Sequence, residues 1–152
     1  DALVFYLGGG GEILSQSLLE NPEQRQHISD AVGGFFILLW EGALPKRLED
    51  NREQNRHPRS AAGLSADGKT LYLLVIDGRR PGSAGATETE TGLILKRLGA
   101  FTGLNLDGGG STALALRRSD GKVRTLNTPV HGGIPGRERG VASCLGIRIR
   151  AD

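Results

Sequence analysis

Residues 87–112 read TETETGLILKRLGAFTGLNLDGGGST, and this stretch decides the class of fold. Thr87 and Glu90 have the spacing of a capping box, in which each side chain bonds a backbone N–H at the start of a helix. Gly99 stands where helices commonly end, because glycine adopts the left-handed conformation without a steric cost. Residues 101–106 form a short apolar run, which predicts a strand directly after the helix. A helix followed at once by a strand is typical of an α/β or α+β domain.

Short apolar runs bounded by turn residues predict the other strands. They are residues 3–7, 12–14, 30–40, 61–64, 70–76, 113–116, 123–126 and 141–149. The polar residues 16–30 predict one short helix or a loop, and residues 44–58 predict a solvated loop. The one clear helix is expected to bury Leu93, Ile94 and Leu98. The fold predicted for the single domain 1–152 is therefore α+β. We expect a mixed, mostly antiparallel and strongly twisted sheet of about eight short strands, with one or two helices.

Composition excludes several classes of function. The chain has 152 residues, with 19 basic and 17 acidic side chains, so it lacks the strong positive charge of many nucleic-acid-binding proteins. Its few aromatic residues, two Tyr, one Trp and four Phe, also argue against base stacking. No apolar run approaches the roughly 20 residues of a membrane-spanning helix. The single cysteine, Cys144, lies in an apolar run and is expected to be a small buried residue.

The segment after the helix and strand carries the clearest chemical signal. Asp107 is followed by Gly108, Gly109 and Gly110, and then by two hydroxyl side chains, Ser111 and Thr112. Three consecutive glycines are costly to order, so a strand gains nothing from them, whereas a loop whose backbone approaches a ligand does. The run lacks the lysine of a P-loop and the G-x-S-x-G pattern of a serine hydrolase. It predicts an active-site loop with a carboxylate at its start.

A second acidic residue and several arginines also stand at or near the ends of predicted strands. Asp77 ends the apolar strand 70–76 and is followed by glycine, as Asp107 is. For Asp77, the sequence favours a role in turn hydrogen bonds and a role in catalysis equally. Arg59, Arg79 and Arg139 stand near strand ends, where a guanidinium fork would match a phosphate or carboxylate if they converged on one cleft.

The sequence requires no cofactor. Asp77 and Asp107 together would suit a calcium ion, because carboxylate oxygens are its preferred ligands. His27, His57 and His131 have no metal-ligand spacing, and His57, held extended by Pro58, is expected to be a loop residue.

The order of these motifs resembles that of the phosphodiester glycosidase family. The matching segments, from about residue 30 to the end of the chain, are RHPRSAAG (56–63), DGKTLY (67–72), VIDGR (75–79), GAT (85–87), LGA (98–100) and NLDGGGST (105–112). The last segment is the most specific. Because residues 77–79 precede this segment in the order found in the family, the match is strong.

Some positions depart from the family pattern. Phe35 stands where the family has proline, Ser60 where it has threonine, and Ser143 where it has asparagine. The family's domain also begins with an Asn-Gly-Gly-aromatic segment that this chain lacks. The chain is therefore expected to be the C-terminal portion of such a domain, completed by a second chain or by another segment.

The resemblance implies a hydrolase that cleaves the glycosidic C–O bond of a sugar-1-phosphodiester, on a glycan or a cell-envelope polymer. It implies Asp107 as nucleophile or base, Asp77 as the second carboxylate, and Asn105 as a ligand of the sugar or a support for Asp107. Arg59, Arg79 and Arg139 would bind the substrate, and phosphate or sugar oxygens would lie on residues 108–112. The family also implies a secreted, periplasmic or cell-envelope protein.

Two alternatives remain from the sequence. One is a non-catalytic glycan or cell-wall binding module on the same fold, in which the replacement of the family's asparagine by Ser143 has impaired the site. The other is a phosphodiesterase that cuts the P–O bond. No nucleic acid is expected as a partner under any of these interpretations.

Overall fold

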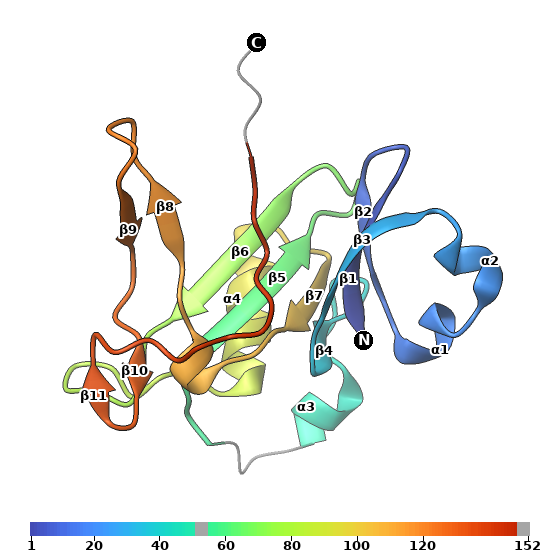
Figure 1. Cartoon of the computed structure of the whole chain (residues 1–152). Helices are drawn as coiled ribbons and strands as arrows, with labels where there is room; N and C mark the ends of the chain where they lie inside the picture. Colours follow the sequence, from blue (N-terminus) through green and yellow to red (C-terminus); the bar gives the residue numbers. More distant parts are fainter. Residues whose placement is uncertain (51–54, 149–152) are drawn as a thin grey trace.

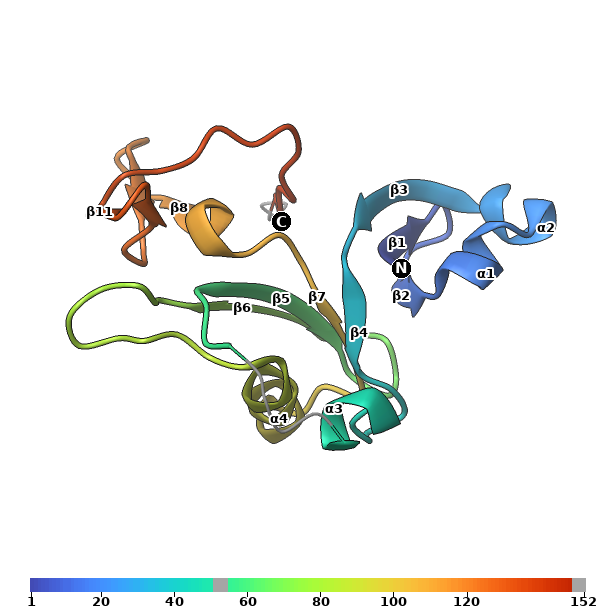
Figure 2. The same cartoon turned by 90° about the horizontal axis from the view of Figure 1, so that it is seen from below.

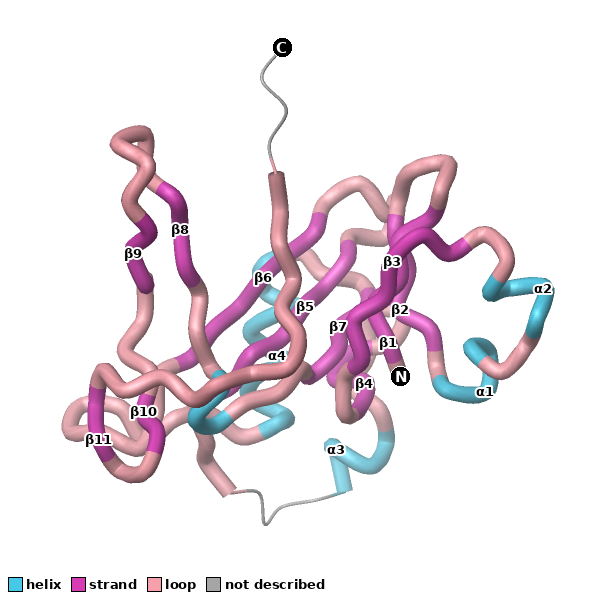
Figure 3. Tube along the Cα trace, in the orientation of Figure 1, coloured by secondary structure: helices cyan, strands magenta, loops and turns pink. Residues whose placement is uncertain are grey.

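The computed structural model describes residues 1–50 and 55–148 of the chain. Within these residues the chain forms eleven strands in four sheets, four α-helices and one 3-10 turn (Figures 1 and 3). Neighbouring strands in every sheet are antiparallel. The predicted α+β, mostly antiparallel class is confirmed. The expected single sheet of about eight strands is wrong in detail, because the shorter strands pair in separate sheets.

The central sheet has four strands in the order β4–β7–β5–β6. These are β4 (Phe36–Leu39), β5 (Arg59–Leu64), β6 (Leu71–Ile76) and β7 (Thr102–Asn105). In register, Arg59 at the start of β5 lies opposite Ile76, and Ala61 lies opposite Asn105. The start of β5 and the ends of β6 and β7 therefore meet at the same end of the sheet.

One face of this sheet is covered by α4 (Glu88–Leu98), which has the predicted capping box and the left-handed Gly99 at its end. Figure 2 shows α4 on one side of β5 and β6. The predicted inward face is wrong, since Leu93 and Leu98 are 44% and 51% exposed, whereas Leu95 is fully buried. The reason is close approach: a Cβ on Gly92 would lie 2.7 Å from the carbonyl oxygen of Leu38. The helix thus packs its smallest residue against the sheet.

A three-stranded sheet, β2–β1–β3, packs against the other face of the central sheet. Its strands are β1 (Ala2–Tyr6), β2 (Gly11–Leu14) and β3 (Ile28–Gly33), and β1 and β2, near the predicted strands 3–7 and 12–14, pair as a hairpin. Leu3 and Ile13 are fully buried and form one cluster with Leu104 of β7. This contact joins the two sheets through a common apolar core.

The strand predicted over residues 30–40 divides between two sheets. β3 pairs with β1, whereas β4 pairs with β7. The chain passes from one sheet to the other at Gly34, where a Cβ would lie 2.5 Å from Cγ of Leu104. A larger residue would be excluded there, and the break follows from that close contact.

The polar segments contain more helix than predicted. Residues 16–30 include two short helices, α1 (Gln16–Leu19) and α2 (Pro22–Arg25), and Asn21 caps the second. Residues 44–58 include α3 (Lys46–Asp50), whose Leu48 is buried in the core, so the predicted loop is wrong over α3. Residues 51–54 of that predicted loop lie outside the described residues.

The C-terminal third forms two small hairpins and an irregular tail. The hairpins pair β8 (Ala115–Arg117) with β9 (Val123–Thr125), and β10 (Val130–His131) with β11 (Ile134–Pro135). The strand predicted over 141–149 is absent from its described part, 141–148, because no strand pairs with it. Cys144 is exposed, which corrects the expectation that it is buried.

Across residues 1–50 and 55–148 no helix is long and apolar enough to pass through a membrane.

Candidate active site

A pocket of about 310 Å³ opens where the start of β5 and the end of β7 meet. Its walls are residues 35–36, 57–59, 105 and 107–110, together with Arg79 and Arg139. The antiparallel register brings these segments together, because the first residues of β5 lie beside the last residues of β7. The structure thus gathers Asp107, the glycine run and three arginines in one pocket, a convergence that the sequence left open.

The glycine run lets the loop after β7 lie against the start of β5. A Cβ on Gly108 would lie 2.7 Å from the carbonyl oxygen of Pro58. Gly109 has a φ of +60°, and a Cβ there would lie 3.1 Å from a guanidinium nitrogen of Arg79. The glycines are therefore needed for close packing beneath Arg79.

The backbone amides of this loop bond mainly to the loop itself. The Gly109 N–H donates to the Pro58 carbonyl, the Ser111 N–H to Gly108, and the Thr112 N–H to Gly109. The N–H groups of Gly109, Ser111 and Thr112 are thus already used in the described structure. Binding of phosphate or sugar oxygens by residues 108–112 stays a prediction, with fewer backbone donors than the sequence suggested.

Asp107 is held by a single arginine at the mouth of the pocket. Its carboxylate forms an ion pair with Arg139, whose Nε donates to Ser111 Oγ at 2.9 Å. The Asp107 side chain is 51% exposed, so it remains open to a ligand. Arg139 therefore orients both Asp107 and Ser111, which explains how a residue 32 positions later joins the site.

Arg79 lines the pocket without a carboxylate partner among the described residues. Its backbone has a φ of +57°, a conformation that costs energy for a residue with a side chain. Its Nη2 donates to His57 Nδ1 at 3.2 Å. A guanidinium without a counter-charge in a pocket is typical of an anion-binding site.

His57, which the sequence predicted to be a loop residue, also lines the pocket. Burial lowers its pKa below the ordinary value, the positive charges of Arg59 and Arg79 lower it further, and Glu88 opposes these effects. Backbone bonds in both directions tie His57 to Ala86, just before α4. The sequence contained a signal for this position. Residues 57 and 59 of an extended segment face the same side, so a pocket lined by Arg59 is expected to be lined by His57 as well.

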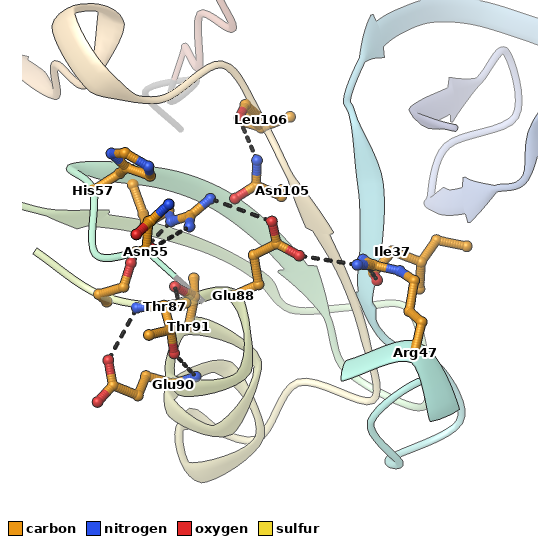
Figure 4. A network of polar contacts seen from close by, with 12 residues as sticks. Ile37, Arg47, Asn55, His57, Thr87, Glu88, Glu90, Thr91, Asn105 and Leu106 are labelled. Atoms are coloured by element: carbon orange, nitrogen blue, oxygen red, sulfur yellow. Dashed lines mark hydrogen bonds and ion pairs between the residues drawn. The ribbon is translucent and has the colours of Figure 1, made fainter. Parts of the chain in front are cut away.

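Arg59 lies at the base of the site and is almost fully buried. Its Nε donates to the Ala86 carbonyl at 3.0 Å, and its Nη1 lies 3.9 Å from an oxygen of Glu88. The other oxygen of Glu88 lies 2.9 Å from Arg47, a contact that Figure 4 shows. Burial lowers the pKa of Arg59, and Glu88 opposes this effect. Arg59 therefore supplies positive charge to the base of the pocket while Glu88 holds it in place.

Two buried polar atoms near the glycine run have no hydrogen-bond partner within the described structure: Asn105 Oδ1 and Thr112 Oγ1. Asn105 donates from Nδ2 to the Leu106 carbonyl at 2.8 Å, and its side chain lines the pocket (Figure 4). Its unpaired oxygen would accept a hydrogen bond from a ligand hydroxyl, since buried acceptors are rarely left unsatisfied. Thr112 is fully buried and does not line the pocket.

Asp77 lies outside the pocket and ties two loops together. Its carboxylate accepts from Arg80 at 2.7 Å, from the Thr128 N–H at 2.9 Å and from Asn127 at 3.2 Å. Burial raises the pKa of Asp77, but these hydrogen bonds outweigh it and hold the pKa below the ordinary value. Because the folded pKa is depressed, this stabilisation is present above the unfolded value of about 3.9 and is lost as the pH falls below it. The structure therefore favours the role in turn hydrogen bonds.

We expect Asp77→Asn to lower the free energy of unfolding by about 1–3 kcal/mol, because Arg80 loses its counter-charge and the Thr128 N–H loses a charged acceptor. Urea unfolding at neutral pH measures this, with the exposed Asp30→Asn as the matched control. If Asp77→Asn instead removed activity with no change in stability, the carboxylate would act in the chemistry and its anchoring role would be contradicted.

The described residues contain no group of three or more His, Cys, Asp or Glu side chains that could hold a metal ion. Asp77 and Asp107 belong to different local networks, Asp77 with Arg80 and Asp107 with Arg139. A calcium ion bound by this pair stays a prediction.

The sequence model of the phosphodiester glycosidase family matches residues 3–148. The chain belongs to the phosphodiester glycosidase family. The match extends the resemblance from the later motifs to nearly the whole chain, including β1 and β2.

One solved structure supports the fold. The chain is similar to the catalytic domain of zebrafish N-acetylglucosamine-1-phosphodiester alpha-N-acetylglucosaminidase, auto-inhibited by its pro-peptide, with a TM-score of 0.60 and 21% identity. That match covers 81% of this chain and 43% of the zebrafish chain, so this chain spans less than half the length of that relative. A hypothetical protein from Synechocystis is 30% identical over 68% of this chain and 19% of its own, with a TM-score of 0.49. No curated protein matches this chain in sequence.

Proposed function

We propose that this pocket hydrolyses the glycosidic C–O bond of a sugar-1-phosphodiester. The observation that carries the proposal is Arg79, a guanidinium without a carboxylate partner among the described residues, which lines the same pocket as the open carboxylate of Asp107. An anion site and a carboxylate side by side suit a substrate with a phosphate on one side of the bond to be broken. Membership in the phosphodiester glycosidase family supports the same reaction.

The positive charges in the pocket suit the negative charge that grows on the leaving phosphate in this reaction. The phosphodiester carries one negative charge, whereas the departing phosphomonoester carries up to two, with a second pKa of about 6. Arg79, with Arg59 beneath it, therefore stabilises the transition state more than the bound substrate. Such a leaving group is only weakly basic, so it does not require a strong general acid.

Asp107 supplies the carboxylate at the sugar carbon. Its two possible roles are nucleophile, forming a glycosyl-enzyme intermediate, and base, taking a proton from the attacking water. The ion pair with Arg139 holds the Asp107 carboxylate in position for either role. The unpaired Asn105 Oδ1 would bind a sugar hydroxyl, and the exposed ring of Phe35 offers an apolar surface at the pocket wall.

Hydrolysis of a sugar-1-phosphodiester in ¹⁸O-labelled water tests the proposal. Label in the sugar product identifies a glycosidase, because water has attacked the sugar carbon. Label in the phosphate product identifies a phosphodiesterase instead. Tight binding of the substrate without any product identifies a glycan-binding module, and either of these two results would overturn the proposal.

We expect Arg79→Ala to lower kcat/KM for a sugar-phosphodiester about 100-fold, since one charged contact to the phosphate is worth roughly 3 kcal/mol in such a site. A neutral aryl glycoside of the same sugar should lose much less. Steady-state kinetics on both substrates gives the comparison, with Arg118→Ala, at an exposed position beside β8, as the matched control. Equal losses on the two substrates would contradict a phosphate role for Arg79.

A further inference from the structure

The hydrogen bond between Arg79 and His57 determines the protonation of the imidazole. A guanidinium can only donate, so His57 Nδ1, 3.2 Å from Arg79 Nη2, must accept. An imidazole that accepts at Nδ1 is neutral and carries its proton on Nε2. The described residues provide no hydrogen-bond partner for Nε2, although His57 lines the pocket.

The charged groups around His57 come from every element that packs there. Arg59 of β5 and Arg79 of the loop after β6 disfavour a second positive charge, and Glu88 of α4 favours one. Across the pocket lie Asp107 and Arg139, which form their own ion pair. In the free pocket, burial and the charges of Arg59 and Arg79 lower the pKa of His57, and the hydrogen bond from Arg79 is made to the neutral ring.

An anion in the pocket would compete directly for that contact. Phosphate oxygens are better acceptors for a guanidinium than a neutral imidazole is, because both charges take part in the hydrogen bond. Arg79 would turn from Nδ1 to the anion, and its positive charge would be offset. Both effects weaken the preference of His57 for the neutral form, and the anion itself favours the imidazolium form.

We propose that His57 takes up a proton when a phosphodiester anion binds, and delivers it to the phosphate as the glycosidic bond breaks. This inference rests on the proposed function and names its acid. The C–O bond breaks with its electron pair on the phosphate oxygen, and the His57 proton passes to that phosphate. Water gives its hydroxyl to the sugar carbon, and its remaining proton returns through Asp107 and solvent to restore the starting state.

An NMR titration of the histidine ring protons tests this step with dimethyl phosphate, a diester anion that does not titrate in the histidine range and cannot be cleaved as a glycoside. The chain has three histidines. The spectrum of His57→Gln identifies the His57 signal by its loss. His27→Gln, at an exposed position in the turn after α2, is the matched control.

In the free protein we expect His57 to titrate below its ordinary value of 6.5, and to titrate higher when dimethyl phosphate is bound. By linkage, dimethyl phosphate should bind about tenfold more tightly at about pH 5.5 than at about pH 8, because one unit of pKa corresponds to a tenfold change. His57→Gln should remove this pH dependence while retaining binding at high pH, and His27→Gln should leave it intact.

Two results would overturn the inference, and they differ in meaning. If dimethyl phosphate binds and shifts the signals of the 107–112 loop, but the His57 titration does not move, then the anion site stands and His57 is not its acid. If dimethyl phosphate does not bind at any pH, the anion site itself is refuted, and the proposed function fails with it.

Discussion

Asp107→Asn is expected to lower kcat on a sugar-1-phosphodiester at least about 1,000-fold, within the range for loss of a catalytic acid or base. The amide has the shape of the carboxylate but can neither attack the sugar carbon nor take a proton from water. The expected loss is the same for both roles of Asp107. Steady-state kinetics with the purified variant measures it.

The fold should survive this change. The Asp107 side chain is 51% exposed, and Arg139, with which it forms an ion pair, is 42% exposed, so the pair contributes little to stability. The melting temperature should therefore stay within a few degrees, and Asp120→Asn, in the turn between β8 and β9, is the matched control. Activity close to that of the unchanged protein would remove Asp107 from the mechanism.

Gly108→Ala is expected to lower kcat/KM about 100-fold and the free energy of unfolding by about 1–3 kcal/mol. The new Cβ would lie 2.7 Å from the Pro58 carbonyl oxygen, so either the loop or the start of β5 must shift. The shift would separate Asp107 from Arg79 and His57, and small displacements of catalytic groups cost large factors in rate. Kinetics and urea unfolding of one preparation measure the two effects.

The control for this variant is Gly8→Ala, where an added Cβ would meet nothing within 4 Å. That variant should change neither activity nor stability. If Gly108→Ala also changed neither, the close packing of the loop beneath Arg79 would not be what positions the site.

The sequence by itself determined the features that depend on local chemistry. The limits of α4 were predicted because the capping box and Gly99 act within a few residues of the helix ends. The turn at Asp67 and Gly68 depends on equally local chemistry: Asp67 accepts from the Lys69 N–H, and Gly68 has a φ of +68°. The family motifs likewise identified Asp107 and the glycine run.

Only the tertiary structure decided which of these residues meet. Asp77 and Asp107 both follow a strand and precede a glycine, yet Asp77 binds Asn127 and Thr128 whereas Asp107 lines the pocket. The sequence predicted His57 to be a loop residue, whereas the fold places it against Arg79.

The packing of helices and strands also depends on the tertiary structure. The buried face of α4 was set by the close approach of Gly92 to Leu38, which periodicity alone does not reveal. The apolar run after residue 140 remained irregular because no strand lies beside it in the described structure. Sequence patterns report interactions between near neighbours in the chain. The partner of a carboxylate, the tautomer of a histidine and the face of a helix depend on residues that only folding brings together.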